Sequence, residues 1–227
     1  MDKKNRIIVF ANQKGGVGKS TLCILMAHYL NERNEPVAIM DADLQQTIFS
    51  QRKRELETLG KKDVPWDVDW LDTRDINVVE RGMKIAKSFP GTILIDAPGN
   101  LSDDKLLPIY RDADYIIVPM TYHPNVVSST KMFAEVMEKV RKQLGAKFVM
   151  WFVPNKIDDR KKKDLDETKH HAWVELHPFG ELLTRINDRA WMERTSTMEI
   201  TKQQSGSVLY AFDRIITEIA EKENGHE

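Results

Sequence analysis

The chain has 227 residues, and its 34 Lys and Arg residues nearly cancel its 35 Asp and Glu residues. This balance excludes a strong overall field toward nucleic acid or an anionic membrane, so any such contact requires a local patch. The single cysteine, Cys23, excludes a disulfide within the chain and a zinc site built from cysteines.

The start of the chain is not typical of a targeting segment. Charged residues up to Arg6 lead into a short apolar run, Ile7 to Ala11, which is shorter than the apolar core of a signal peptide. No later run approaches the ~20 apolar residues of a membrane span. We therefore expect a cytoplasmic protein with no membrane contact.

Short apolar runs alternate with amphipathic stretches, which is the pattern of βαβ units around a parallel sheet. Strands are predicted at Ile7–Ala11, Pro36–Met40, Thr92–Ile95, Tyr115–Pro119 and Lys147–Val153, with weaker candidates at Val68–Leu71 and Glu181–Ile186. Helical spacing predicts helices over Lys19–Asn31, Val126–Gln143 and Val208–Lys222. The polar stretch 51–65 reads as a helix end plus a surface loop, not as a linker. We expect residues 1–227 to form a single α/β domain, a twisted, mainly parallel sheet with helices on both faces.

The strongest motif follows the first predicted strand and opens the first helix. It comprises Lys14, Gly15, Gly16, Val17, Gly18, Lys19, Ser20 and Thr21. Glycines let the backbone N–H groups surround a phosphate chain, and the helix N-terminus adds a positive end. In such a phosphate-binding loop, Lys19 reaches the β- and γ-phosphates and the Ser20 hydroxyl binds Mg²⁺. A glycine-rich turn with a chance Lys-Ser pair is the alternative.

Two later segments end in carboxylates. Asp41 and Asp43 close the second strand one residue apart, so both can point at one metal–phosphate centre. Alternatively, they are a strand-end aspartate and a helix N-cap. Asp96 closes an apolar strand and is predicted to hold Mg²⁺ through a water molecule, because magnesium sheds its hydration shell reluctantly.

Two further sites are predicted near the end of the sheet. Asn155 follows a strand, and its amide can donate to and accept from a purine edge; a turn-forming asparagine is an equally good interpretation. The candidates for a local cationic patch, which any contact with nucleic-acid phosphates requires, are Arg160, Lys161, Lys162, Lys163, Arg185, Arg189 and Arg194. The alternative for this run is a solvated helix face, diluted by neighbouring aspartates.

The segment Asn12-Gln13-Lys14-Gly15-Gly16-Val17-Gly18-Lys19-Ser20-Thr21 resembles the deviant Walker A box of the ParA/MinD ATPases. The resemblance implies ATP and Mg²⁺ as cofactors and an ATP-dependent homodimer in which Lys14 reaches the partner's phosphates. The Asp41–Gln45 segment is similar to the family's switch, which implies that Asp43 positions the attacking water and Asp41 supports the magnesium shell. The family often has Pro at the position of Leu44 and Gly at that of Gln46, which puts the loop conformation in doubt.

Within that family, the chain looks most like the short ParA-like partition proteins. One cysteine is too few for the iron–sulfur relatives, and the acidic C-terminal end is unlike the membrane helix of MinD. The resemblance implies a slow ATPase that binds DNA without sequence preference and is stimulated by a ParB-like partner. A nucleotide-gated adaptor for conjugation or secretion machinery, or a metabolic ATPase of the same fold, stays open.

Overall fold

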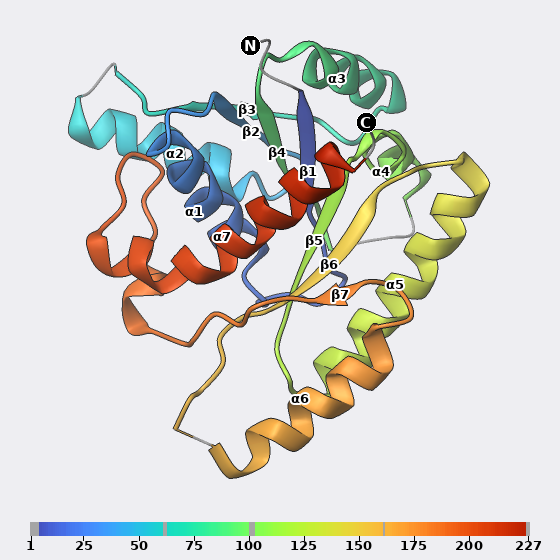
Figure 1. Cartoon of the computed structure of the whole chain (residues 1–227). Coiled ribbons are helices and arrows are strands. Elements are labelled where there is room, and N and C mark those ends of the chain that lie inside the picture. Colours follow the sequence, from blue (N-terminus) through green and yellow to red (C-terminus); the bar gives the residue numbers. More distant parts are fainter. Residues whose placement is uncertain (1–4, 61–62, 100–102, 161, 226–227) are drawn as a thin grey trace.

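The computed structural model describes residues 5–60, 63–99, 103–160 and 162–225. One seven-stranded sheet has the order β3-β2-β4-β1-β5-β6-β7, and all its neighbouring strands are parallel (Figure 1). The strands are β1 (Arg6–Phe10), β2 (Val37–Asp41), β3 (Asp67–Trp70), β4 (Thr92–Asp96), β5 (Tyr115–Met120), β6 (Val149–Pro154) and β7 (Glu181–Leu182).

Helices cover both faces of this sheet (Figure 1). The elements α1 (Lys19–Asn31), α2 (Thr47–Leu59) and α7 (Lys202–Asn224) contribute to the apolar core on one face. The core on the other face includes α3 (Ile76–Ser88), η1 (Asp104–Leu106), α4 (Leu107–Asp112), α5 (Pro124–Leu144) and α6 (Lys162–Leu176). A short 3₁₀ helix, η2 (Ala190–Glu193), precedes α7.

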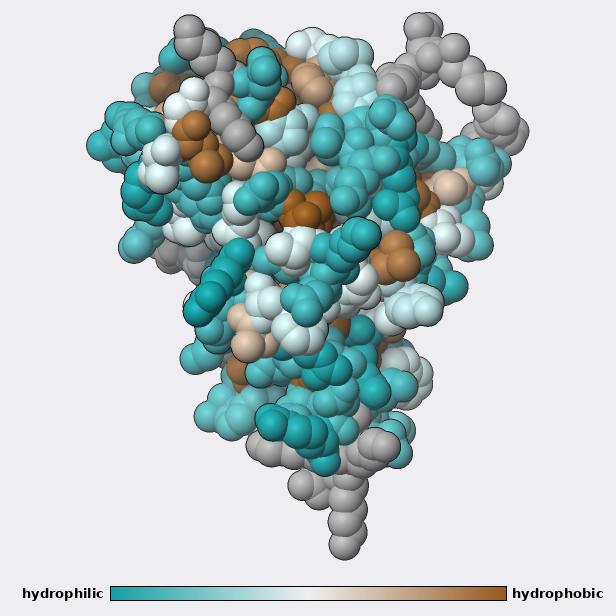
Figure 2. Space-filling view, turned by 90° about the vertical axis from the view of Figure 1, so that its left-hand side faces the viewer, coloured by the Kyte–Doolittle hydropathy of each residue, from teal (hydrophilic) through white to brown (hydrophobic). Residues whose placement is uncertain are grey.

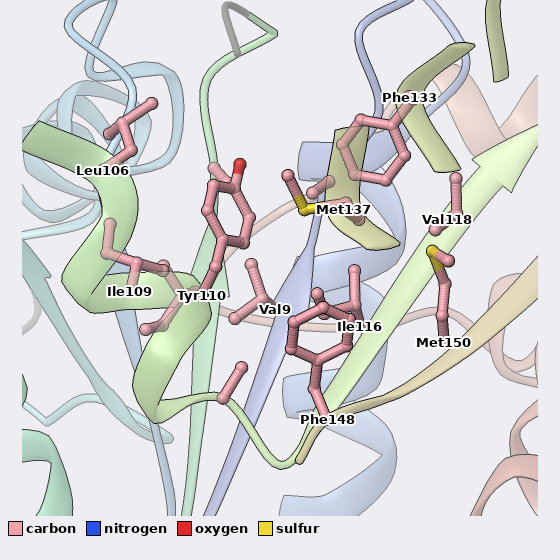
Figure 3. Close-up of a cluster of buried hydrophobic side chains, with 14 of the residues drawn as sticks. Val9, Leu106, Ile109, Tyr110, Ile116, Val118, Phe133, Met137, Phe148 and Met150 are labelled. Atoms are coloured by element: carbon pink, nitrogen blue, oxygen red, sulfur yellow. The ribbon is translucent and has the colours of Figure 1, made fainter. Parts of the chain in front are cut away.

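Alternate residues of the strands point to opposite cores, as the pleat of a strand requires. In β1, Val9 contributes to the core with α4 and α5, whereas Ile8 and Phe10 contribute to the core with α1 and α7. Figure 3 shows the first of these cores, in which Tyr110 and Met137 meet side chains of the central strands. Both faces are therefore buried, which explains why these strands read as continuous apolar runs.

The predicted strands and the helix Lys19–Asn31 are confirmed within about two residues, with one exception. The segment Glu181–Ile186 was expected to be a full strand, but only Glu181–Leu182 pairs with β6 as β7. The expectation was too long because β6 ends at Pro154 and the chain then turns through Lys156, whose φ is 56°. The residues after Leu182 form individual hydrogen bonds with the chain near that turn instead of a continuous strand pairing. For example, the Ile186 N–H donates to the Pro154 carbonyl (2.7 Å).

Two predicted helices extend beyond their expected bounds: α5 spans Pro124–Leu144 and α7 spans Lys202–Asn224. The polar stretch 51–65 contains the end of α2, which stops at Gly60 in a left-handed conformation. None of the described helices combines the length and the apolar composition needed to span a bilayer.

The parallel register brings functional residues to one edge. Asp41 at the end of β2 pairs with Asp96 at the end of β4, and Asp96 pairs with Phe10 at the end of β1. β1 lies between β4 and β5, so the chain leaves it at the point where the strand order reverses. Ligand sites of open α/β sheets lie at this point, outside the carboxyl ends of the strands.

Candidate nucleotide-binding site

The loop between β1 and α1 has the backbone of a phosphate-binding loop. Gly16 and Gly18 have φ angles of 75° and 101°, in the left-handed region that favours glycine. A Cβ atom on Gly18 would lie 2.3 Å from Nδ2 of Asn155, so this position excludes any side chain. Gly18 also occupies the N-cap of α1, and no side chain of the described residues caps that helix. Its first N–H groups are therefore left for an anionic ligand.

Two buried asparagines hold the loop in place through hydrogen bonds. Asn12 donates from Nδ2 to the Pro119 carbonyl (2.8 Å) and to Oγ1 of Thr130 (3.0 Å), and its Oδ1 accepts from the Lys14 amide (3.1 Å). Asn155 donates from Nδ2 to the Val17 carbonyl (2.9 Å). These bonds tie the loop to the ends of β5 and β6 and fix it before any ligand binds.

Asn155 therefore supports the loop backbone, and a contact with the base stays a prediction. The support from Asn12 and Thr130 was missed by the sequence reasoning. A polar residue directly after the apolar run Ile7 to Ala11 was the available signal for Asn12, but nothing local marks Thr130 on α5.

Asp96 is the most perturbed carboxyl of the site. It is 1% exposed, and its Oδ2 accepts a 2.5 Å hydrogen bond from the Ser20 hydroxyl. Burial raises its pKa to about 7, with Ser20 opposing this and Asp41 adding to it. The other oxygen, Oδ1, is buried and has no hydrogen-bond partner among the described residues.

The side chains Ser20 and Asp96 fit a magnesium site. A hydroxyl and a carboxylate are the hard oxygen donors that Mg²⁺ accepts, and the unpartnered Oδ1 is free to accept from metal-bound water. In the described part of the chain, no group of three or more His, Cys, Asp or Glu side chains could hold a metal ion. Phosphate oxygens and water would have to complete the coordination, as is usual for Mg²⁺.

Asp41 is fully buried and caps α2. Its Oδ2 accepts from the amides of Ile48 (2.9 Å) and Phe49 (3.0 Å), and its Oδ1 accepts from the amide of Asp43 (3.2 Å). Burial raises the pKa of Asp41, and these three backbone bonds oppose the shift. Asp41 is thus the strand-end aspartate of the alternative interpretation, and its carboxylate binds the first amides of α2, whereas the N-cap position of α2 is Gln46 and not Asp43. A place for Asp41 in the magnesium shell stays a prediction.

The remaining predicted site residues lie at the same edge. Asp43 is partly exposed, and its Oδ1 accepts from the Gln45 amide (2.9 Å). Lys14 is exposed on the loop, and Lys19 is half-buried at the start of α1, where its charge lowers the pKa of Asp96. The structure thus brings Lys19, Ser20, Asp41, Asp43 and Asp96 to the carboxyl ends of β1, β2 and β4.

The cationic residues predicted to contact DNA are less well assembled. Arg160 pairs with Asp158 (2.8 Å) and Arg189 pairs with Asp159 (2.8 Å), which neutralises part of their charge. Arg185 and Arg189 line a polar groove of about 540 Å³ beside Lys202 and Tyr210, and Arg194 is exposed on the segment before α7. Lys161 and the side chains of Lys162 and Lys163 lie outside the described residues. The DNA contact stays a prediction.

A family model described as the CobQ/CobB/MinD/ParA nucleotide binding domain matches residues 8–197. No curated protein matches the chain.

Solved structures with low sequence identity share the fold. A protein of Borrelia burgdorferi assigned to plasmid partition and bound to AMPPNP is 21% identical, with a TM-score of 0.73, covering 95% of this chain and 100% of that chain. A complex of Cyanothece McdA with ATP is 14% identical, with a TM-score of 0.73, covering 97% and 98% of the two chains. MinD in the MinC:MinD cell division protein complex of Aquifex aeolicus is 16% identical, with a TM-score of 0.72, covering 93% and 96%.

Proposed function

Because the chain belongs to the CobQ/CobB/MinD/ParA family of nucleotide-binding domains, we propose that it is a Mg-ATP switch for DNA partition. In this proposal the chain binds ATP, pairs with a second copy, coats DNA without sequence preference and leaves it after hydrolysis. It acts in the cytoplasm, and a ParB-like partner on the cargo stimulates hydrolysis.

The triphosphate is bound by the loop between β1 and α1. Backbone N–H groups from Gly15 to Thr21 surround the phosphates, and Lys19 contacts the β- and γ-phosphates. Lys14 is exposed on the rim of the loop, so it is available to the phosphates of a second protomer. That task is the one an arginine finger performs in related phosphoryl transfers.

Ser20 and Asp96 would hold a magnesium ion, Asp96 through water, and Asp41 keeps α2 and the Asp43 segment in register with them. When bound, magnesium would supply positive charge that offsets the charge of the phosphates. Asp43 orients a water molecule in line with the bond to the leaving oxygen. Basal turnover is expected well below the ~10 per second of a median enzyme, because hydrolysis releases the protein from DNA and must be slow enough for it to act there.

One observation carries the proposal: the Ser20–Asp96 hydrogen bond closes the phosphate loop onto the end of β4, next to Asp41. A glycine-rich turn without a ligand gives no reason for a buried carboxyl with an unpartnered oxygen, which costs about 1–3 kcal/mol.

The test is ATP turnover by Asp43→Ala, with and without duplex DNA. Turnover is expected to fall about 100-fold while ATP binding is kept, because the water loses its orienting group. Glu221→Ala, which removes an exposed carboxylate near the C-terminal end of α7, is the control and should leave turnover unchanged. If Asp43→Ala hydrolyses ATP like the original chain, Asp43 is not catalytic.

A second function is favoured by the ion pairs of Arg160 and Arg189, which weaken the predicted cationic surface. In this alternative the chain is a nucleotide-gated adaptor that positions conjugation, secretion or other machinery without DNA. Binding to arbitrary duplex only with ATP, and falling steeply with salt, supports partition. Absence of binding at low salt with ATP supports the adaptor.

A further inference from the structure

α2 connects the Asp41–Gln46 segment to a distant part of the chain, which we call the strap and define as residues 194–201 between η2 and α7. The N-terminus of α2 is bound to the Asp41 carboxylate through the amides of Ile48 and Phe49. The position of α2 therefore fixes where the segment with Asp43 begins and ends.

Few apolar contacts hold α2 in place. Ile48 and Arg52 are the buried residues of this helix, and its apolar residues Phe49 and Leu56 are only partly buried, so Ile48 is its one fully buried aliphatic side chain. Most surface helices are held by a broad apolar stripe, and this one lacks it. Figure 2 shows the side of the molecule where α2 lies as mainly hydrophilic, with isolated hydrophobic residues.

A buried polar cluster replaces the missing stripe. Arg52 is 5% exposed and donates from Nε to the Thr197 hydroxyl (2.8 Å), from Nη2 to the Thr197 carbonyl (2.8 Å) and from Nη1 to the Trp66 carbonyl (2.6 Å). Its guanidinium carbon lies 4.3 Å from the centre of the Trp66 ring, a cation–π contact.

Glu55 completes this cluster one turn further along α2. Its Oε2 accepts from the Thr197 amide (2.9 Å) and from the Thr197 hydroxyl (2.5 Å). Gln51 donates to the Thr195 carbonyl (2.5 Å) and to Glu55 (2.9 Å). The fully buried Thr197 hydroxyl thus links Arg52 to Glu55, and its loss would leave both charged groups short of a partner.

The strap itself is tied to its surroundings. The Ser196 carbonyl lies 2.9 Å from Nε2 of the buried His28 on α1. Gln204 at the start of α7 donates to the carbonyls of Trp191 (2.9 Å) and Arg194 (3.2 Å). A shift of the strap must therefore move α2, because side chains in a close-packed interior transmit displacement.

We propose that Arg52, through the Thr197 hydroxyl, is a positioning residue for ATP hydrolysis: it holds α2, and with it the Asp41–Gln46 segment, so that Asp43 faces the γ-phosphate. The proposal rests on the function proposed above. Because Gln51, Arg52 and Glu55 are bonded to the strap and not to the loop between β1 and α1, the cluster acts on the rate of hydrolysis and not on nucleotide affinity.

The experiment compares Thr197→Val, Thr197→Ser and Arg6→Gln in ATP binding, kcat and thermal stability. Thr197→Val keeps the shape of the side chain and removes the hydroxyl, and Thr197→Ser restores it. Arg6→Gln is the matched control: it removes a half-buried arginine paired with Glu223 and Glu35 at the other end of β1. We expect kcat to fall about 10-fold in Thr197→Val, with the ATP Kd within 2-fold, and to stay within 2-fold in the other two variants.

An unchanged kcat in Thr197→Val, or an equal fall in Arg6→Gln at the same loss of Tm, overturns the proposal. If the original chain hydrolyses no ATP, the proposed function fails. Hydrogen exchange then tests separately whether Thr197 holds the N-terminus of α2 in place. The amides of Ile48 and Phe49 must lose protection in Thr197→Val and keep it in Arg6→Gln. Equal protection in both variants rejects the positioning role.

Discussion

Asp96 combines burial, one short hydrogen bond and one oxygen without a partner among the described residues, all in a single carboxyl group. Structures rarely leave a buried carboxylate oxygen without a partner, because the ionised form then loses its hydration without compensation. The site therefore suits a bound cation, and the protein without a cation is less stable as a result.

This arrangement makes the stability of the nucleotide-free protein depend on pH. The pKa of Asp96 is raised from 3.8 to about 7, so between these values the folded chain keeps a proton that the unfolded chain has lost. Stability therefore falls as the pH rises from about 4 to about 7, and the loss is complete above 7. Asp96→Asn, which cannot ionise, should raise the Tm at pH 8 by about 5 °C and leave it nearly unchanged at pH 4.

Thermal unfolding in magnesium-free buffer measures this effect. Gln203→Ala, which replaces an exposed residue of α7 with no ionisable group, is the control and should show no difference between the two pH values. Equal Tm changes for Asp96→Asn at pH 4 and pH 8 would contradict the raised pKa.

At the scale of elements, α2 shows how the switch segment departs from its relatives. The resemblance implied a glycine at the position of Gln46, and Gln46 is the N-cap of α2 with φ of 51° and ψ of 42°. A left-handed conformation costs a residue with a Cβ atom about 1–2 kcal/mol, so the backbone keeps the shape that glycine would suit.

Gln46→Gly should therefore stabilise the protein by about 1 kcal/mol, since the relief of strain exceeds the extra entropy of the unfolded chain. Chemical denaturation measures the change. Gln45→Gly is the matched control: the neighbouring Gln45 is exposed and its φ is not positive, so its substitution should destabilise. If both variants shift the denaturation midpoint in the same direction, strain at Gln46 is not the cause.

The elements also show what can be predicted from the sequence. Strands buried on both faces and the glycine loop are local signals, and β1, β2, β4, β5 and the start of α1 lie where those signals indicate. The edge strand β7 was overestimated because its length depends on where β6 turns away, which is a tertiary fact. The role of Arg52 was missed for the same reason: its partner Thr197 is distant in sequence, and a buried arginine looks like a solvated one in a polar stretch.

At the scale of the molecule, the predicted partner is a second copy of the chain. Lys14 is exposed on the rim of the nucleotide site, where a residue that serves another protomer must lie. Within one protomer, Lys19 would contact the phosphates. The side of the site where Lys14 lies would then stay available to the second protomer.

Asp43→Ala with Mg-ATP should form a stable dimer of the 26.3 kDa chain, because bound nucleotide is no longer consumed. Adding Lys14→Ala should weaken that dimer at least 10-fold, since it removes a charge-assisted contact between protomers. Light scattering after size exclusion gives the mass. Lys105→Ala, which removes another half-exposed lysine, is the control. A Lys14→Ala variant that dimerises as tightly as its parent would rule out the contact across the dimer.

The position of β1 in the middle of the sheet also sets the order in which the chain can assemble during synthesis. β1 leaves the ribosome before both of its neighbours in the sheet, which are residues 92–96 and 115–120. Until those segments emerge, the N-terminal strand has no edge to join, and contacts this distant in sequence form slowly. Nascent chains halted before β4 should therefore retain no nucleotide, and the phosphate-binding loop becomes functional only after β4 and β5 have emerged.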